Sequence, residues 1–352
     1  MVVLLIGRFG NFENLESHIK DSFEELGHQV IPFDIWGGEL RSKNKILVYI
    51  NKANQHIKSI KKSLPYYDKK KTKELQNICK SHPFDLIVSC HDFLTPTQVS
   101  GIKKICKIPI VLWFPDALLN FGKMMFANAE YDVLFFKDPS IVKVLRDELG
   151  LNAYYLPECC NPKHHRKVHL NEEDWKTYGC DIATAGNLHT VRTKFFENLT
   201  EYDVKIWGNP SPFWLNSSKI NHMVQHKYVS FDEKCKAFLG AKIVINNLHP
   251  TEINSLNART FEVAATSAFQ LVNYRDSAIS LFEPDKEMVY FTDLKDMKEK
   301  VAFYLQHPEE RLRIGNASMK RSVTDHTFTK RISTLLSIVF DNERNYPKVQ
   351  RN

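Results

Sequence analysis

Short runs of apolar residues recur through the first half of the chain, and helix-length segments separate most of them. The runs occupy residues 2–6, 29–33, 84–89, 108–113 and 132–136. Apolar runs of this length, bounded by turn-forming residues, are typical of strands that are buried on both faces. Because strands and helices alternate, the pattern predicts a parallel sheet covered by helices on both sides.

The second half of the chain repeats this rhythm and then becomes helical. Its apolar runs occupy residues 181–185, 203–207, 242–246, 269–273 and 287–291, and helices are expected at 309–324 and 327–340. A chain of 352 residues exceeds what one hydrophobic core usually supports. The sequence therefore predicts an α/β fold of two Rossmann-like domains with a cleft between them, whose last helices cross back to the first domain.

The boundary between the two domains is expected near residues 157–176. Two prolines, Pro157 and Pro162, interrupt a charged stretch that lacks a strand pattern. The first domain is placed at 1–158, together with a helix at about 327–345, and the second at 176–325. Ligands of open parallel sheets bind beyond the carboxyl ends of the strands, so the polar residues that follow each strand are the candidates for a site.

The formal net charge of +7 is concentrated in one segment. Residues 41–80 contain twelve Lys or Arg residues against the two acids Asp68 and Glu74. Apolar residues at helical spacing run through this segment from Ile46 to Leu64. Such a basic amphipathic helix either packs on its own domain or lies on an anionic membrane surface, and the pattern leaves both open. Nucleic acid is not expected as a partner, because few aromatic residues are interleaved with the lysines.

The cysteine and apolar content bears on the compartment and on metals. Seven cysteines form neither an evident disulfide framework nor a Cys-x-x-Cys pair, and no run reaches the ~18 apolar residues of a membrane helix. A cytoplasmic protein is expected, with peripheral contact to the inner face of the membrane as an extension. No metal is expected, because Cys159, Cys160, His164 and His165 have the wrong spacing for zinc and Asp-x-Asp is absent.

The strongest chemical signal lies at residues 242–272, where a buried-type strand runs through a polar loop into a helix. Ser255 or Asn257 can cap this helix, and Arg259 and Glu262 share one of its faces. A helix N-terminus offers N–H groups to a diphosphate, to which Arg259 adds a charge, while Glu262 can accept hydrogen bonds from ribose hydroxyls. The alternative is a surface salt bridge between Arg259 and Glu262.

Further motifs surround this helix in a fixed order. They are Gly186-Asn187 with Arg192, Trp207-Gly208, Asn257 to Glu262, Ala268-Phe269-Gln270-Leu271 and His326-Thr327-Phe328. The order resembles the donor half of GT-B glycosyltransferases, specifically the CgeB-like group that is often labelled glycosyl transferases group 1. The resemblance covers about residues 156–340, whereas the first 150 residues match mainly in architecture.

The resemblance implies a metal-independent glycosyltransferase without a cofactor. It would move a sugar from a nucleoside diphosphate sugar to a hydroxyl group of a glycan, a lipid-linked or a protein acceptor. The donor-binding residues expected are Gly10, Gly186, Asn187, Arg192, Tyr228, His249, Asn254, Ser255, Asn257, Arg259 and Glu262. Among these, Tyr228 borders the nucleobase and His249 contacts the sugar or its phosphates.

Some positions depart from the family pattern. Retaining enzymes with a Glu-x7-Glu motif carry a first glutamate where this chain has Asn254, so retention of configuration does not follow from the resemblance. Ser267 replaces a usual glycine. The loop from Gly7 to Asn11 has only two glycines, which makes it weak evidence for dinucleotide binding; it either meets a phosphate or forms a simple tight turn.

An inverting transfer needs a general base at a strand end of the first domain. His91, Asp92 and Asp116 follow the strands that end near Cys90 and Phe114. An aspartate in such a place equally serves to cap the next helix. Two other functions use the same architecture: a nucleotide-sugar epimerase, and a non-catalytic protein that binds a glycan or nucleotide.

Overall fold

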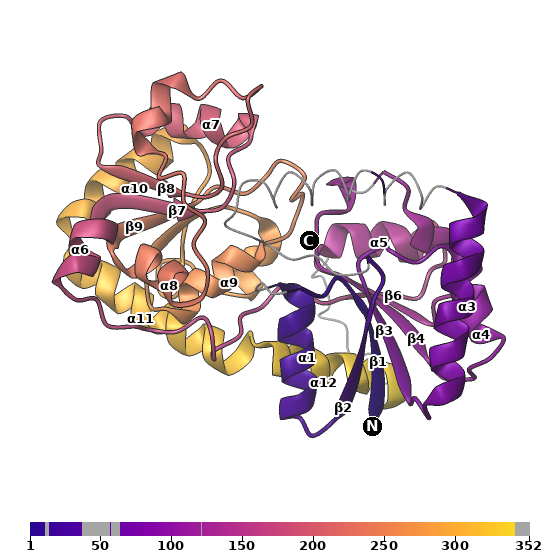
Figure 1. Cartoon of the computed structure of the whole chain (residues 1–352). Coiled ribbons are helices and arrows are strands. Elements are labelled where there is room, and N and C mark those ends of the chain that lie inside the picture. The colour runs from indigo at the N-terminus through magenta and orange to yellow at the C-terminus, as the bar shows by residue number, and fades with distance from the viewer. Residues whose placement is uncertain (11–13, 37–56, 58–63, 121, 342–352) are drawn as a thin grey trace. The chain divides into compact units, whose positions relative to one another are not determined.

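The computed structural model divides the chain into two compact units. It describes residues 1–10, 14–36, 57, 64–120 and 122–341. The first unit comprises Met1–Pro157 and the chain from Phe328 onward, and the second comprises Glu158–Thr327 (Figure 1). Asn11 and most of the basic segment 41–80 lie outside the described residues.

The first unit is built on a parallel sheet with the strand order β2-β1-β3-β4-β5-β6. Its elements are β1 (Val2–Gly7), α1 (Leu15–Glu25), β2 (Gln29–Asp34), α3 (Pro65–Ser81), β3 (Leu86–Cys90), α4 (Pro96–Lys103), β4 (Ile110–Phe114), the 3-10 turns η1 (Leu118–Asn120) and η2 (Met125–Asn128), β5 (Val133–Phe136), α5 (Pro139–Asp147), β6 (Ala153–Tyr155), α12 (Phe328–Leu336) and the π-helical turn η6 (Ser337–Asp341).

The alternation of side chains along the strands explains how helices cover this sheet. Leu4 of β1 packs in a cluster with Leu75 of α3 and Val99 of α4. Phe328 of α12 packs near Trp113 of β4, with ring centroids 6.2 Å apart, and stacks on His18 of α1 at 5.2 Å. Of the two C-terminal helices expected to return, α12 is therefore part of the first unit, whereas the helix at Pro308–Asp325 belongs to the second.

The second unit is built on a parallel sheet with the strand order β11-β10-β9-β7-β8. Its elements are α6 (Glu172–Tyr178), β7 (Cys180–Ala185), α7 (Thr190–Phe196), η3 (Glu197–Leu199), β8 (Val204–Trp207), η4 (Ser218–Met223), α8 (Phe231–Leu239), β9 (Ala241–Asn246), α9 (Ala258–Ala265), β10 (Gln270–Asn273), η5 (Asp276–Ser280), β11 (Val289–Phe291), α10 (Leu294–Gln306) and α11 (Pro308–Asp325).

Strand β9 shows why polar residues at its end meet helix α9. Ile243 and Ile245 belong to one hydrophobic cluster, which includes α10, whereas Val244 belongs to another cluster with Val263 of α9. Because side chains alternate between the faces of a strand, Asn246 falls on the same face as Val244. The last residue of the strand thereby lies on the α9 side of the sheet.

The predicted fold class, two Rossmann-like α/β domains, is confirmed. Each predicted strand is present with its ends shifted by at most two residues, and the structure adds β6. The second unit begins at Glu158, earlier than the expected 176, because the segment before α6 packs into it. Cys160, for example, is fully buried and its N–H donates to the carbonyl of His326 at 2.9 Å.

Candidate functional site

Gly186 marks the point where charged side chains gather at the carboxyl edge of the second sheet. It follows β7 directly and has a φ of +139°, a conformation that favours glycine. A Cβ atom at this position would lie 2.2 Å from Nη2 of Arg259 and 2.9 Å from Nη1 of Arg192. The absence of a side chain at 186 therefore leaves room for two guanidinium groups.

Arg192 is a buried cation that neighbouring polar groups hold in place. Its Nε donates to Oδ1 of Asn247 at 3.1 Å, and its Nη1 donates to the carbonyl of Asn187 at 2.8 Å. Burial, with the nearby charge of Arg259, lowers the pKa of Arg192. An arginine nevertheless stays protonated at neutral pH. The site thus contains a fixed positive charge in surroundings of low polarity.

Arg259 supplies the second charge from the first turn of α9. Its Nη1 donates to Oδ1 of Asn246 at 3.0 Å, which explains the role of that strand-end asparagine. Burial lowers the pKa of Arg259, and the charge of Glu262 opposes this shift. Within the described ranges, neither Arg192 nor Arg259 forms an ion pair with a carboxylate. Two neighbouring guanidinium groups without such a partner suit an anionic ligand.

Of the two residues predicted to cap α9, Ser255 and Asn257, the structure shows Asn257 as the N-cap. Its Oδ1 accepts a hydrogen bond from the N–H of Thr260 at 3.2 Å. Asn257 and Asn246 also exchange side-chain hydrogen bonds at 2.9 and 3.1 Å. Ser255 instead donates its hydroxyl to Glu252 at 2.5 Å. The start of α9 is thus tied to the end of β9 by side-chain amides.

Glu262 does not pair with Arg259, contrary to the surface salt-bridge alternative. Its Oε1 lies 3.1 Å from Nζ of Lys234 in α8 and 3.5 Å from Nε2 of His165. His165 is almost fully buried, and its Nδ1 accepts a hydrogen bond from the N–H of Asn161. The segment expected to be a linker therefore contributes a side chain beside the predicted ribose-binding carboxylate.

Two histidines that follow the neighbouring strands β7 and β9 meet beside the arginines. The rings of His189 and His249 lie 4.7 Å apart in an edge-to-face arrangement. Burial lowers the pKa of His189 to about 4, and the charges of Arg192, His249 and Arg259 act in the same direction. His189 is therefore neutral at pH 7.

The remaining predicted donor residues have different surroundings. Asn254 anchors the next turn, because its Oδ1 accepts from the N–H of Ser277 at 2.9 Å and its carbonyl accepts from the Ser277 hydroxyl. Asn187 accepts a hydrogen bond from the N–H of Asn209 at 3.2 Å. Tyr228 is exposed in the segment that leads to α8, and Gly10 is exposed in the first unit.

The three predicted bases lie at the carboxyl edge of the first sheet. Asp92 is buried and accepts hydrogen bonds from the N–H groups of Met125 at 2.6 Å and Phe126 at 2.9 Å. Asp116 is partly exposed and accepts from the N–H of Ala117 at 2.7 Å. Both aspartates thus accept hydrogen bonds from backbone N–H groups of the segment that follows β4.

His91 has an unusual backbone and a lowered pKa. Its φ is +59°, and burial lowers the pKa to about 4; Arg8 and Lys137 lower it further, whereas Asp116 opposes them. Nearby, Glu16 is a buried carboxylate that accepts from the N–H of Arg8 at 3.0 Å. Burial raises the pKa of Glu16.

Several residues of these edges escaped the sequence interpretation. Asn246 ends β9, Asn247 directly follows it, and His189 lies in the short loop after β7, so the rule that ligands bind at carboxyl ends could have identified them. The sequence marks Glu16 less clearly, because its only indication is its place in the first turn of the helix that follows the loop from Gly7 to Asn11. His165 and Lys234 carry no such signal.

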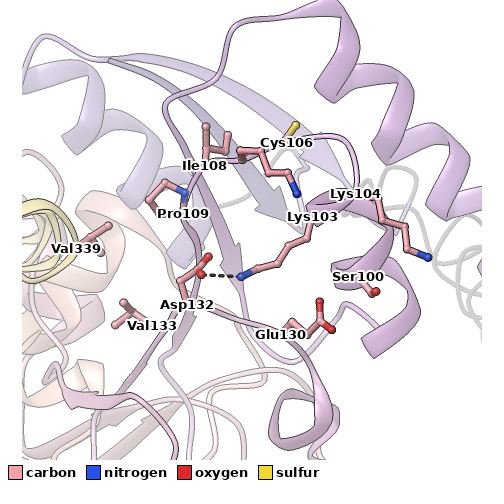
Figure 2. Close-up of a pocket in the computed structure, with 11 residues that line it drawn as sticks. Ser100, Lys103, Lys104, Cys106, Ile108, Pro109, Glu130, Asp132, Val133 and Val339 are labelled. Atoms are coloured by element: carbon pink, nitrogen blue, oxygen red, sulfur yellow. Dashed lines mark hydrogen bonds and ion pairs between the residues drawn. The ribbon is translucent and has the colours of Figure 1, made fainter.

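An open hollow of about 700 Å³ lies in the first unit, at the opposite edge of its sheet (Figure 2). Pro109 and Asp132, which precede β4 and β5, line it together with Lys103, Lys104 and Glu130. Asp132 pairs with Lys103 at 2.6 Å and accepts from the N–H of Ile110 at 2.8 Å. Because it lies at the amino ends of the strands, this hollow brings together none of the predicted site residues.

In the part of the chain that the structure describes, His, Cys, Asp and Glu side chains form no group of three or more that could hold a metal ion. No helix among these residues is both long enough and apolar enough to cross a membrane. All seven cysteines are free thiols.

The second half of the chain is similar in sequence to known proteins. Residues 192–337 match the family model described as glycosyl transferase-like. The spore protein CgeB of Bacillus subtilis (strain 168) is 27% identical over 208 residues, which cover 54% of this chain. The chain spans 63% of the length of that relative.

Solved structures extend the likeness in fold to nearly the whole chain. HepE from Anabaena, solved in complex with UDP and glucose, has a TM-score of 0.65 at 11% identity and covers 96% of this chain and 100% of its own. A sucrose-phosphate synthase from Thermosynechococcus elongatus has a TM-score of 0.63 at 10% identity, with 97% and 99% covered. The predicted resemblance to CgeB-like, group 1 glycosyltransferases is thus confirmed as a similarity, and the predicted GT-B fold is confirmed.

Proposed function

We propose that this protein transfers a sugar from a nucleoside diphosphate sugar to a hydroxyl acceptor, without a metal ion or cofactor. The observation that carries the proposal is the pair of guanidinium groups of Arg192 and Arg259 beside Gly186, neither of which pairs with a carboxylate in the described residues. A diphosphate has two negatively charged groups that such a pair can bind. The structures of HepE with UDP and with UDP-glucose, which share this fold, support the choice of ligand class.

The remaining donor residues take roles around this diphosphate. Glu262 accepts hydrogen bonds from the ribose hydroxyls, with Lys234 and His165 holding its carboxylate in position. Tyr228 lies beside the nucleobase. His249, near Arg192 and Arg259, contacts the phosphates or the sugar.

Departure of the diphosphate is the step that these residues catalyse. As the bond between the sugar and the diphosphate breaks, negative charge builds up on the leaving oxygen, and the fixed guanidinium groups stabilise it. They take the part that a divalent metal plays in other transferases. Their positions are set by Asn246, Asn247 and the carbonyl of Asn187, so little reorganisation is needed during the reaction.

For an inverting transfer, we assign the general base to Asp116 in preference to Asp92. Asp92 is buried, and both of its carboxylate oxygens accept backbone hydrogen bonds. Asp116 is partly exposed, and it lies close enough to His91 to influence the pKa of that imidazole. The acceptor class and the membrane contact of residues 41–80 stay predictions from the sequence.

A thermal-shift screen tests the proposed ligand. The protein is heated with UDP, GDP, TDP and ADP sugars, and with a CMP sugar as the matched control that has one phosphate. At ~100 times its dissociation constant a ligand stabilises by ~2.7 kcal/mol, so at least one diphosphate donor should raise the melting temperature. The CMP sugar should have a smaller effect, because its single phosphate carries one negative charge where a diphosphate carries two.

Two results would contradict the proposal. One is a set of unchanged melting temperatures across all diphosphate donors. The other is equal stabilisation by the CMP sugar. Incubation with the stabilising donor alone, followed by analysis of the sugar, separates transfer from epimerisation, since an epimerase isomerises the sugar without an acceptor.

A further inference from the structure

His189 lies among cations and has a fixed hydrogen-bonding pattern. It is the residue before α7, at the carboxyl end of β7, and His249 follows the neighbouring strand β9. Arg192, Arg259 and His249 are close enough to act on its charge. The side chain is partly buried, so it is neither a surface histidine nor a core one.

The backbone selects one tautomer of the His189 imidazole. Its Nδ1 accepts a hydrogen bond from the N–H of Arg192 at 3.3 Å. A nitrogen that accepts carries no proton, so in the neutral ring the proton is on Nε2. For His189, Nε2 has no hydrogen-bond partner among the residues that the structure describes. An N–H donor is thereby left available beside the arginine pair.

Protonation of His189 would disrupt this arrangement. A proton on Nδ1 would face the N–H of Arg192, and the capping hydrogen bond would be lost. A third positive charge would also repel the guanidinium groups of Arg192 and Arg259. Burial and these charges keep the imidazole neutral, with a pKa of about 4. The ring is therefore suited to donate a hydrogen bond without adding charge.

We propose that His189 is a further residue of the donor site, where its neutral imidazole donates Nε2–H to a phosphate oxygen of the bound nucleoside diphosphate sugar. The proposal rests on the proposed function. No proton is transferred and no covalent bond is formed by the ring. His249, whose ring packs edge-to-face against His189 at 4.7 Å, helps to orient it.

Two substitutions separate the outer nitrogen from the inner one. In His189→Asn, the side-chain oxygen can still accept from the N–H of Arg192, because asparagine is a favoured N-cap, but the outer donor is lost. In His189→Gln, the longer amide can place an N–H near the position of Nε2. His222→Asn, an exposed histidine of the same unit, is the control.

Titration calorimetry with the nucleotide sugar that gives the largest thermal shift measures the effect. His189→Asn should raise the dissociation constant about tenfold, as expected for one lost hydrogen bond to a charged group. His189→Gln should recover most of the affinity, and His222→Asn should bind like the unmodified protein. The melting temperatures of the free variants should agree within a few degrees.

The pH dependence of binding tests the neutral state. The diphosphate of a nucleotide sugar is esterified at both ends, so it lacks the second phosphate ionisation near pH 6. The dissociation constants of the unmodified protein and of His189→Asn should therefore follow the same pH profile between about pH 5.5 and 8. Tighter binding below pH 6.5 that disappears in His189→Asn would show a charged imidazolium and overturn the proposal.

The remaining outcomes are also decisive. Unchanged affinity of His189→Asn would show that the ring does not contact the ligand. If no nucleotide sugar binds the unmodified protein, the proposed function fails and this inference fails with it. Binding to the unmodified protein combined with an unaffected variant rejects His189 alone.

Discussion

The two units have similar sheets, yet the charged residues at their carboxyl edges are used differently. In the first unit, Asp92 and Asp116 accept hydrogen bonds from backbone N–H groups in the segment that follows β4. In the second unit, Arg192 and Arg259 are held by asparagines and a carbonyl, none of which carries a negative charge. The first edge satisfies both oxygens of Asp92 internally and leaves Asp116 partly exposed, whereas the second edge leaves positive charge for a ligand.

The largest expected effect comes from removing one guanidinium group. Arg259→Ala should lower the rate of diphosphate release about 100-fold, corresponding to the ~3 kcal/mol that a preorganised donor contributes in a transition state. Folding should be intact, because Asn246 keeps its hydrogen bonds to Asn257. Arg313→Ala, which removes an exposed arginine paired with Glu310, is the control. A near-normal rate for Arg259→Ala would contradict the view that the carboxyl edge of the second sheet, unlike that of the first, provides positive charge for a ligand.

Acidification should weaken the first unit through His91. The pKa of this buried histidine is about 4 in the folded protein, against about 6.5 when unfolded, so unfolding takes up a proton between these pH values. The free energy of unfolding should therefore fall by about 2 kcal/mol from pH 7 to pH 4.5. Urea unfolding at both pH values measures this, and His91→Asn, which tolerates the positive φ, should show a smaller fall.

A side chain at Gly186 should disturb the arginine pair. Gly186→Ala introduces a Cβ atom where the two guanidinium groups now lie and also strains a backbone with φ of +139°. The stability should fall by about 1–2 kcal/mol, and donor affinity should fall as well. Gly27→Ala is the matched control, since its φ is +80° but no atom lies within 4 Å of the added Cβ. Equal donor affinity in both variants would argue against a site at Gly186.

The smallest effect is expected at Asp92, where the first unit uses a carboxylate structurally. Asp92→Asn keeps one acceptor oxygen and loses the other, so the first unit should be destabilised by about 1 kcal/mol. Donor affinity should not change. Asp116→Asn should instead leave unfolding nearly unaffected and lower turnover. A reversed pattern would move the general base to Asp92.

The fold could be predicted from the sequence, because parallel strands that are buried on both faces appear as clear runs of apolar residues. The edge strand β6 was not predicted, because it is only three residues long and shows no recognisable hydrophobic period. The site was predicted at Gly186, Arg192 and Arg259 because motifs marked these positions. Partners brought close only by tertiary packing, such as Lys234 and His165 with Glu262, could not be predicted from local spacing.

The position of α12 has a consequence for biosynthesis. Phe328 packs against Trp113 and His18, and Arg331 donates to the carbonyl of Pro157 at 2.8 Å. These late residues leave the ribosome only after the whole second unit, Glu158–Thr327, has been made. The amino-terminal half is therefore translated first yet completed last, and a fragment of residues 1–157 should expose the apolar surface that α12 covers and aggregate.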